Sequence, residues 1–450
     1  MTYAETVSYL LTVGQELRGV KFDLANVSRL LEALGHPERC WKSVHIAGTN
    51  GKGSVAAMME AVLRAAGYRT GLYTSPHLVR VNERIRVAGE EISDADFASV
   101  CGDVLALVER LLAERALPGH PSFFECLTAT AFEHFRRAGC DIAVLETGMG
   151  GRLDATNVVR PLVSVITPVD FDHEAYLGHS LGQIAFEKAG IIKEGGVVIS
   201  APQRPEAAAV IERVAHERGA RLVVATEVQG PRSEVQGHQP ADLGLWTLDL
   251  GPLPVALPGR HQVENARLVV LAAEQLRRLG LRISDQALRQ GLAGVRWPGR
   301  LEWIQGRPRL LLDGAHNPAG ARALRAYLEE FRISDCGFRI SNVEKGGNPQ
   351  SAIRNPKLVL LFGAMRDKAV AEMADLLFPL AGAVVLTRPA QKRAATTQVL
   401  AQLTAHLNHR IIECEEPGAA LAKARDLAGP DGIVVVTGSL YLVGAVKPEL

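Results

Sequence analysis

Short apolar runs alternate with longer amphipathic segments along most of the chain. The runs that predict buried strands lie at 41–47, 69–73, 141–146, 163–169 and 196–200, and again at 309–312, 358–362, 383–386 and 433–436. Residues 1–40 are expected to be helical, 81–87 alternate like an exposed strand, and apolar residues at helical spacing predict helices at 54–66, 94–115, 127–137, 184–191, 262–279, 284–292, 319–331, 370–378 and 396–407. Apolar strands that alternate with helices are typical of parallel sheets covered on both faces, so the pattern predicts an α/β protein.

Three stretches depart from this alternation and suggest how the chain is divided. Residues 220–257 form short segments broken by Gly, Pro and Gln, which predicts a small, mostly antiparallel sheet. Trp297-Pro-Gly-Arg300 is punctuated like a linker, and the βα pattern restarts after it. Residues 332–357 contain no predicted element, and we interpret them as a mobile loop insertion remote from the chemistry. We therefore predict a mostly parallel sheet domain over 1–297 and a smaller Rossmann-like, doubly wound domain over 298–450.

The most informative turn is Gly48-Thr49-Asn50-Gly51-Lys52-Gly53-Ser54, between a predicted strand and a predicted helix. Such a turn gathers backbone N–H groups and a helix N-terminus at one point, and Lys52 adds a positive charge. The spacing is not the full G-x-x-x-x-G-K-[ST], so it is irregular as a Walker motif. The alternative is a glycine-rich turn with a surface lysine. We interpret the stretch as a nucleotide phosphate site, which makes the first domain P-loop-type.

Other polar residues are expected at the same edge of the sheet, because ligands of parallel sheets gather beyond the carboxyl ends of the strands. These are Ser75, Glu146 and His173. A nucleotide triphosphate needs Mg²⁺, which prefers oxygen ligands, so Glu146 is the first candidate ligand and the hydroxyls of Ser54 and Ser75 are further ones. Glu146 has the alternative of a helix cap or a partner for Arg152, and His173 that of a structural histidine.

Two further groups are weaker candidates on spacing alone. In Asp313-Gly-Ala-His-Asn-Pro318, Asp313 is a candidate to hold a ribose or a metal-bound water, and His316 a candidate to face the cleft. Asn317-Pro318 has the alternative of an Asx turn that caps the next helix. Arg300, at the predicted domain junction, is a candidate phosphate cation. Lys188 lies in the middle of a predicted helix, where spacing predicts only a solvated lysine.

Composition excludes several classes of function. The 450 residues carry 50 Lys+Arg against 49 Asp+Glu, so no overall field favours nucleic acid or an anionic membrane. No apolar run approaches the roughly 18–20 residues that cross a bilayer, and the start Met-Thr-Tyr-Ala-Glu shows no signal peptide. The six cysteines form no CxxC or zinc spacing, which is typical of reduced thiols in a cytoplasmic protein.

Six motifs in order resemble those of folylpolyglutamate synthase, a family of the Mur ligase superfamily that is often bifunctional with dihydrofolate synthase in bacteria. They are Gly48-Thr-Asn-Gly-Lys-Gly-Ser54, Thr74-Ser-Pro-His-Leu78, Glu146-Thr-Gly-Met-Gly-Gly-Arg-Leu-Asp-Ala-Thr-Asn157, Phe186-Glu-Lys-Ala-Gly-Ile-Ile-Lys193, Asp313-Gly-Ala-His-Asn-Pro318 and Gly438-Ser-Leu-Tyr441. The resemblance runs from about residue 20 to the C-terminus, 332–357 excepted. Any one motif is unspecific; six in register are specific.

The resemblance implies a role for each matching position. The ATP phosphates would be held by Gly48, Thr49, Asn50, Gly51, Lys52, Gly53 and Ser54. One Mg²⁺ would be bound by Ser75 and Glu146 and a second by His173, and Lys188 matches the family's carbamylated lysine, which is a metal ligand. The nucleotide contacts of the family match Asn265, Arg300 and Asp313, His316 would face the active site, and Phe124 and Asp154 match positions near the pterin. Among these, Lys52, Lys188 and His316 are the implied catalytic residues. A monomer is the family expectation.

The expected chemistry is the ATP-dependent joining of a carboxylate to the amine of L-glutamate through an acyl phosphate, with reduced folate, dihydropteroate or both as substrate. A polyglutamate synthase without the second activity is one alternative. Another is a sister Mur ligase acting on a nucleotide-linked muramic acid, which normally has an extra N-terminal domain that a phosphate turn at residue 48 leaves no room for. A non-catalytic ATP-binding protein predicts missing metal ligands, yet Glu146, His173 and Lys188 are present.

Overall fold

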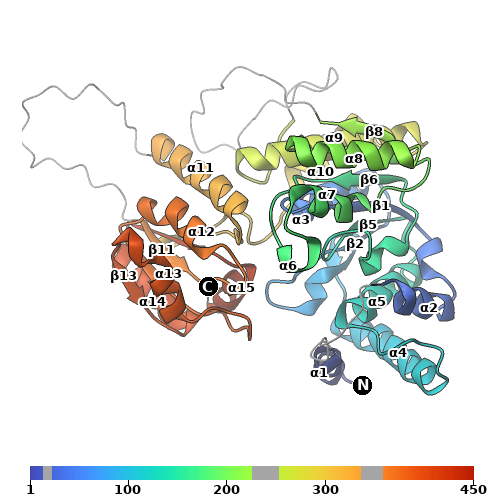
Figure 1. Ribbon diagram of the computed structural model, residues 1–450, viewed down its shortest axis with the longest axis horizontal. Coiled ribbons are helices and arrows are strands. Elements are labelled where there is room, and N and C mark those ends of the chain that lie inside the picture. Colours follow the sequence, from blue (N-terminus) through green and yellow to red (C-terminus); the bar gives the residue numbers. More distant parts are fainter. Residues whose placement is uncertain (14–22, 226–252, 336–357, 450) are drawn as a thin grey trace, which may run out of the picture. The chain divides into compact units, whose positions relative to one another are not determined.

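The computed structural model describes residues 1–13, 23–225, 253–335 and 358–449. They form two compact units (Figure 1). The first holds most of the described chain up to Arg296, and the second holds Trp297–Leu450 together with the short segment Leu257–His261. No helix among the described residues is long and apolar enough to cross a membrane.

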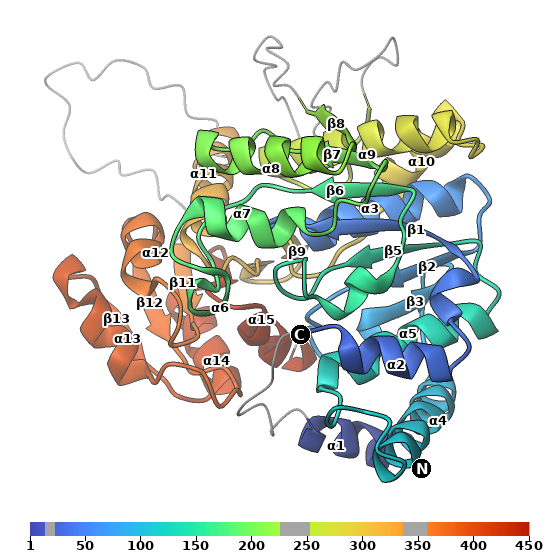
Figure 2. The same ribbon diagram turned by 45° about the vertical axis from the view of Figure 1, so that its right-hand side comes forward.

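The first unit is built on an eight-stranded sheet with the order β4-β3-β2-β5-β1-β6-β7-β8. Its strands are β1 (Lys42–Ala47), β2 (Thr70–Tyr73), β3 (Ile85–Val87), β4 (Glu90–Glu91), β5 (Ile142–Glu146), β6 (Val163–Ile166), β7 (Val197–Ser200) and β8 (Arg221–Val224). The strands from β2 to β8 in this order pair in parallel, whereas β3 and β4 add an antiparallel edge. Figure 2 shows β6, β1, β5, β2 and β3 following one another across the sheet. The predicted mostly parallel sheet is confirmed.

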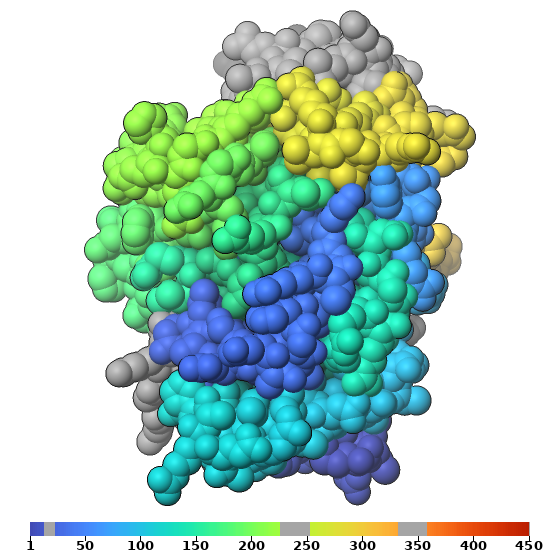
Figure 3. All heavy atoms as spheres, turned by 90° about the vertical axis from the view of Figure 1, so that its right-hand side faces the viewer, coloured from blue at the N-terminus to red at the C-terminus, as the bar shows by residue number. Residues whose placement is uncertain are grey.

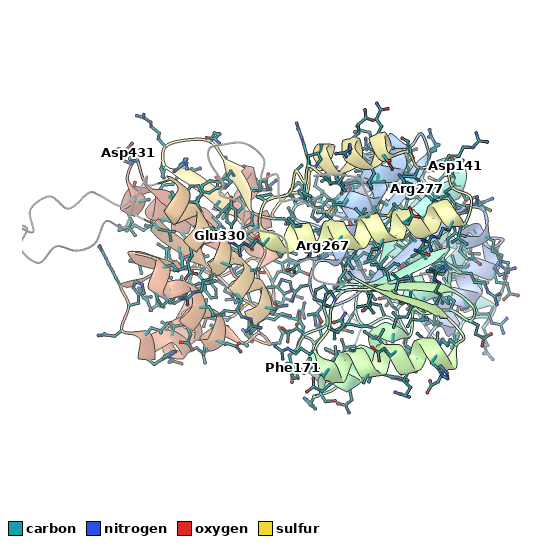
Figure 4. The ribbon with its side chains drawn as sticks, turned by 90° about the horizontal axis from the view of Figure 1, so that it is seen from above. Asp141, Phe171, Arg267, Arg277, Glu330 and Asp431 are labelled. Carbon is teal, nitrogen blue, oxygen red and sulfur yellow. The ribbon has the colours of Figure 1, made fainter. Side chains whose placement is uncertain are left out.

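Helices cover both faces of this sheet. They are α1 (Tyr3–Val13), α2 (Ala25–Ala33), α3 (Lys52–Ala65), α4 (Asp94–Ala113), α5 (Phe123–Arg137), α6 (Glu174–Leu177), α7 (Leu181–Ala189), α8 (Pro205–Glu217), α9 (Arg260–Arg278) and α10 (Asp285–Gly294). Figure 4 shows α8 on one face and α9, which carries the labelled Arg267 and Arg277, on the other. Helix α10 packs closely on α3, since a Cβ on Gly291 would lie 2.5 Å from the Cα of Val62.

Apolar side chains buried between the sheet and its helices stabilise the layered packing of the first unit. On the face that carries Ala47 of β1, Ile166 of β6 packs with Ile184 of α7 and Ile211 of α8. Further along that face, Leu145 of β5 packs against α5, and α5 also contacts α2 and α4. In Figure 3 the blue residues of α2 and the cyan residues of α4 and α5 lie side by side on the surface. Burying such side chains contributes roughly 1.5–3 kcal/mol each, so the strands are held where the sequence is most apolar.

The second unit contains a six-stranded sheet with the order β13-β12-β11-β14-β10-β9. Its elements are β9 (Glu302–Ile304), β10 (Arg309–Leu312), α11 (Pro318–Asp335), β11 (Leu358–Phe362), α12 (Val370–Leu377), β12 (Ala383–Leu386), α13 (Thr397–Thr404), β13 (Ile411–Glu413), α14 (Pro417–Ala428), β14 (Ile433–Thr437) and α15 (Leu440–Val446). All its strand pairs are parallel except β9 with β10, so the predicted doubly wound sheet is confirmed.

Three local predictions are wrong in part. Residues Val81–Arg84 form a 3₁₀ turn rather than a strand, because the Glu83 carboxylate accepts the N–H groups of Leu78, Val79 and Arg80 and bends the chain. Within 220–257, β8 joins the main sheet in parallel, and 226–252 lie outside the described residues. Within the predicted insertion 332–357, helix α11 continues to Asp335, and 336–357 lie outside the described residues.

Candidate active site

The phosphate loop follows β1 directly and has a fixed shape. The N–H groups of Thr49 and Asn50 donate to the carbonyl of Pro168 at 2.9 and 3.4 Å. Gly48 and Gly51 have positive φ angles of 148° and 87°, and Gly51 is the N-cap of α3. A Cβ on Gly48 would lie 1.8 Å from Oγ1 of Thr167, so the loop needs glycine at this position. The helix N-terminus predicted from the sequence is therefore present.

Two lysines converge on this loop. Nζ of Lys52 donates to the carbonyls of Gly48 and Thr49 at 3.1 Å each. Nζ of Lys188, which α7 carries, donates to the same Gly48 carbonyl at 2.7 Å. Lys188 is only 4% exposed, so the solvated lysine predicted from spacing is wrong. Burial, and then the charge of Lys52, lowers the pKa of Lys188 to about 7. The side-chain nitrogens of two lysines, one half-buried and one buried, therefore meet at one carbonyl oxygen.

Glu146 lies on the neighbouring strand end, because β5 pairs with β1. Its carboxylate is buried, and Oε2 accepts a hydrogen bond of 3.1 Å from the N–H of Ser75, which lies in the loop after β2. Arg152 pairs with Glu187 at 2.9 Å, so the alternative partner considered for Glu146 is engaged elsewhere. Ser75 and Glu146 are thus brought together beside the phosphate loop.

His173 follows β6 on the same edge of the sheet. It has a left-handed conformation with φ 52° at the start of α6, and its N–H donates to Asp172 at 2.9 Å. Nε2 of His173 lies 4.0 Å from Oδ1 of Asp172. The structure therefore places His173 at the predicted edge of the sheet, next to a carboxylate.

The donors around Glu146 fit Mg²⁺. Among the described residues, no cluster of three His, Cys, Asp or Glu side chains is arranged for a metal ion. Mg²⁺ does not require one, because it takes one or two carboxylates and completes its octahedron with water and phosphate oxygens. A buried carboxylate next to a serine and a phosphate loop has that chemistry, so Glu146 and Ser75 would be the residues to hold the ion.

The loop after β5 carries Asp154 and lies against Phe124 of α5. Both oxygens of Asp154 accept hydrogen bonds: Oδ2 from the N–H groups of Gly148 and Met149 at 2.8 and 3.0 Å, Oδ1 from Thr156. Burial raises the pKa of Asp154, and these bonds oppose the rise. The ring of Phe124 lies against Gly148, where a Cβ would be 2.6 Å from Cζ. Asp154 thus organises the loop and Phe124 covers it.

Asn265 on α9 reaches the other side of the phosphate loop. A Cβ on Gly51 would lie 2.5 Å from Oδ1 of Asn265, and Nδ2 of Asn265 donates to Gln262 at 3.0 Å. Sequence reasoning did not identify Gln262 or Thr167, which shape the loop from outside. Thr167 had one available signal, its position near the end of the strand predicted at 163–169.

The second unit contains a separate group of candidates at the end of β10. Asp313 is buried and accepts the N–H groups of Leu301 and Ala315 at 3.0 Å each. Burial raises the pKa of Asp313, and the Arg300 charge opposes the rise. Nδ1 of His316 bonds to the Gly314 carbonyl at 2.9 Å. The two oxygens of Asp313 therefore fix the turn on which His316 lies.

The alternative for Asn317 is confirmed in this turn. Oδ1 of Asn317 accepts the N–H of Gly320 at 2.9 Å and so caps α11. Arg300 also lies against this turn, since a Cβ on Gly314 would be 2.4 Å from its Nη1. Asp313, Arg300 and His316 are thus neighbours within the second unit.

Comparisons with known proteins cover the whole chain. Residues 117–273 match the Mur ligase middle domain, and residues 349–440 match the Mur ligase, glutamate ligase domain. The dihydrofolate synthase/folylpolyglutamate synthase of Bacillus subtilis is 35% identical over 441 residues, which is 96% of each chain. The folylpolyglutamate synthase of Lacticaseibacillus casei is 34% identical and covers 100% of this chain and 99% of its own.

Solved structures agree with these relatives. Folylpolyglutamate synthase of Mycobacterium tuberculosis in complex with ADP superposes with a TM-score of 0.86 at 32% identity, covering 99% of this chain and 98% of that one. FolC of Escherichia coli in complex with DHPP and ADP gives a TM-score of 0.80 at 29% identity, covering 100% and 97%.

Proposed function

This chain belongs to the folylpolyglutamate synthase/dihydrofolate synthase family of ATP-dependent Mur-type ligases, and we propose that it adds L-glutamate to reduced folates and to dihydropteroate. The observation that carries the proposal is the phosphate loop with Lys52 and Lys188 on the Gly48 carbonyl, next to buried Glu146 on the adjacent strand. Relatives of this length in complex with ADP and an ATP analogue support ATP as the nucleotide.

The reaction begins with activation of the substrate carboxylate. A carboxylate oxygen attacks the γ-phosphorus of ATP, the bond to the β–γ bridging oxygen breaks, and ADP leaves an acyl phosphate. The glutamate amine then attacks the acyl carbon, an amide forms, a proton is lost from nitrogen, and phosphate departs. Within the phosphate loop 48–54, the amides at the N-terminus of α3 and the ammonium of Lys52 bind the phosphates. Glu146 and Ser75 would hold a Mg²⁺ ion, which would neutralise charge on the phosphate oxygens, and His173 would hold a second ion.

We assign Lys188 as a carbamylated lysine. Its neutral amine would attack CO₂ and lose a proton, which converts a cation into a carboxylate ligand beside the phosphate loop. Burial, and then the charge of the neighbouring Lys52, favour the neutral amine that this step needs. A ¹³C NMR spectrum in ¹³C-bicarbonate should show a carbamate signal that is absent from Lys188→Gln. A wild-type protein without that signal contradicts the assignment.

The remaining candidates complete the proposed substrate sites. Asn265, Arg300 and Asp313 are proposed nucleotide contacts, and His316 is proposed to act in the active site. Asn265 lies in the ligase domain assigned to 1–297, whereas Arg300, Asp313 and His316 lie in the domain assigned to 298–450. For the pterin, Phe124 and the Asp154 loop are proposed, because an aromatic ring and a fixed row of backbone groups lie beside Glu146. The enzyme is proposed to work as a monomer.

The test is phosphate release that depends on both ATP and glutamate, measured in Mg²⁺ with dihydropteroate or with tetrahydrofolate. Turnover with both establishes the bifunctional enzyme, and turnover with tetrahydrofolate alone reduces it to a polyglutamate synthase. Lys52→Ala is the matched inactive control, since it removes the phosphate cation while Lys188 remains. ATP binding without turnover on either substrate contradicts the proposed function.

A further inference from the structure

A buried histidine in the central strand of the first unit has no role in the mechanism above. His45 lies in β1, three positions before Gly48, and is fully buried. Its Nε2 is 2.8 Å from Oγ1 of Thr156, while its Nδ1 has no hydrogen-bond partner. A half-satisfied imidazole in the core costs free energy, so its retention calls for a reason beyond packing.

The direction of the hydrogen bonds follows from the donors available. The Thr156 hydroxyl donates to Oδ1 of Asp154, and the Thr156 N–H also donates to that oxygen. Because the only proton of the Thr156 hydroxyl is donated to Asp154, the hydroxyl oxygen must accept the hydrogen bond from His45. His45 therefore carries its proton on Nε2, and a chain of hydrogen bonds runs from His45 through Thr156 to Asp154.

Asp154 connects Thr156 to the backbone of loop 147–154. Its other oxygen accepts the N–H groups of Gly148 and Met149 at 2.8 and 3.0 Å, so all four acceptor positions of the carboxylate are filled. Gly148 in turn lies against the ring of Phe124. A displacement of Thr156 would therefore move the surface beside which the pterin is proposed to bind.

The same strand also leads into the phosphate loop. The N–H of Thr147 donates to the carbonyl of Ile46 at 2.9 Å, which ties the start of loop 147–154 to β1 at the residue after His45. Loop 147–154 and β1 are therefore joined twice, once by this backbone bond and once from His45 through Thr156 to Asp154. Reacting atoms must lie about 3–3.5 Å apart, so the offset between these two loops matters for the attack on ATP.

We propose that His45 is a positioning residue that, through the Thr156 hydroxyl and Asp154, sets the position of loop 147–154 relative to the phosphate loop and thereby the affinity for the pteridine-bearing substrate. The substrate part rests on the proposed function. The part concerning the loop stands on the hydrogen bonds alone.

The kinetic test uses Thr156→Val, which keeps the shape and removes the hydroxyl. We expect the KM for dihydropteroate and for tetrahydrofolate to rise about tenfold, as for the loss of one buried hydrogen bond, with the KM for ATP changed less than about twofold. Thr156→Ser should restore the KM. Thr130→Val is the matched control, because Thr130 is equally buried but donates within α5 to the Cys126 carbonyl. Equal pteridine KM values for Thr156→Val and Thr130→Val overturn the proposal.

Two measurements need no turnover and separate this proposal from the proposed function. The ¹⁵N spectrum of the histidine rings, with His45 assigned by comparison with His45→Gln, should show the Nε2–H tautomer in the wild type. Amide hydrogen exchange at Gly148 and Met149 should accelerate in Thr156→Val and not in Thr130→Val. An Nδ1–H tautomer overturns the proposal even if Thr156→Val does not fold. A wild type without turnover but with the expected tautomer and exchange rejects only the function.

Discussion

Gly48 has the strictest requirement of any residue in the phosphate loop. We expect Gly48→Ala to abolish measurable binding of a non-hydrolysable ATP analogue and to lower the free energy of unfolding by about 2 kcal/mol, because φ is 148° and a methyl group would overlap Thr167. Calorimetric titration and urea denaturation measure the two effects. Gly67→Ala is the control: φ is 89° there, but nothing lies within 4 Å of the added carbon. It should lose about 1 kcal/mol and keep nucleotide affinity. ATP binding by Gly48→Ala contradicts the prediction.

At the residue scale the sequence predicted positions better than environments. The glycine turn, Ser75, Glu146 and His173 were expected at the carboxyl ends of strands and lie there, because strand ends follow from apolar runs. The burial of Lys188 was not predictable from spacing, since it depends on how α7 packs beneath the loop. The hydrogen bond of His45 was equally unpredictable from the sequence, because its partner Thr156 is 111 positions away.

The start of α5 is the element that positions Phe124. Ser122 accepts the Glu125 N–H at 3.3 Å, and Glu125 accepts the Ser122 N–H at 2.7 Å, which together form a capping box. We expect Ser122→Ala to lower the free energy of unfolding by about 1 kcal/mol and to raise the pteridine KM several-fold, because the first turn loses its cap. Steady-state kinetics and urea denaturation report both.

Ser284→Ala provides the comparison for that change. Ser284 caps α10 by accepting the Ala287 N–H at 3.0 Å, so a similar loss of stability is expected without a change in the pteridine KM. If both variants have the wild-type KM, α5 does not position Phe124 in the proposed way.

At the element scale, long apolar runs were predictable and short edge elements were not. The strands β1, β5, β11 and β12 lie where the sequence is continuously apolar, and each is almost entirely buried. The edge strand β9 is three half-buried residues, and its pairing with β10 depends on a chain reversal that no periodicity records. The helices α14 and α15 were also not predicted.

Two neutral histidines of the first unit set a pH dependence for the whole molecule. Burial lowers the pKa of His45 to about 3; burial and then the Arg84 charge lower that of His77 to about 4. Unfolded histidine has a pKa of about 6.5, so below that pH the unfolded chain binds protons that the folded chain does not. The stabilisation that comes from keeping these two histidines neutral is therefore fully present above about pH 6.5 and is lost as the pH falls toward 4. We expect the thermal midpoint to decrease steadily over this window.

The variant His77→Gln tests the source of this dependence. Glutamine can still accept the hydrogen bond that Nε of Arg84 donates to His77 at 2.9 Å, but it does not titrate. Its thermal midpoint should therefore fall less steeply between pH 6.5 and 4 than that of the wild type. Parallel curves for the two proteins assign the acid sensitivity to other groups.

The shared Gly48 carbonyl also has a consequence for turnover in the presence of product. Lys52 lies on that carbonyl before any ligand is bound, at the N-terminus of α3, so the loop attracts small anions as well as nucleotide. Orthophosphate is released by the proposed reaction at this point. It should therefore compete with ATP and slow each new cycle as it accumulates, which ties the rate of glutamate addition to the phosphate concentration around the enzyme.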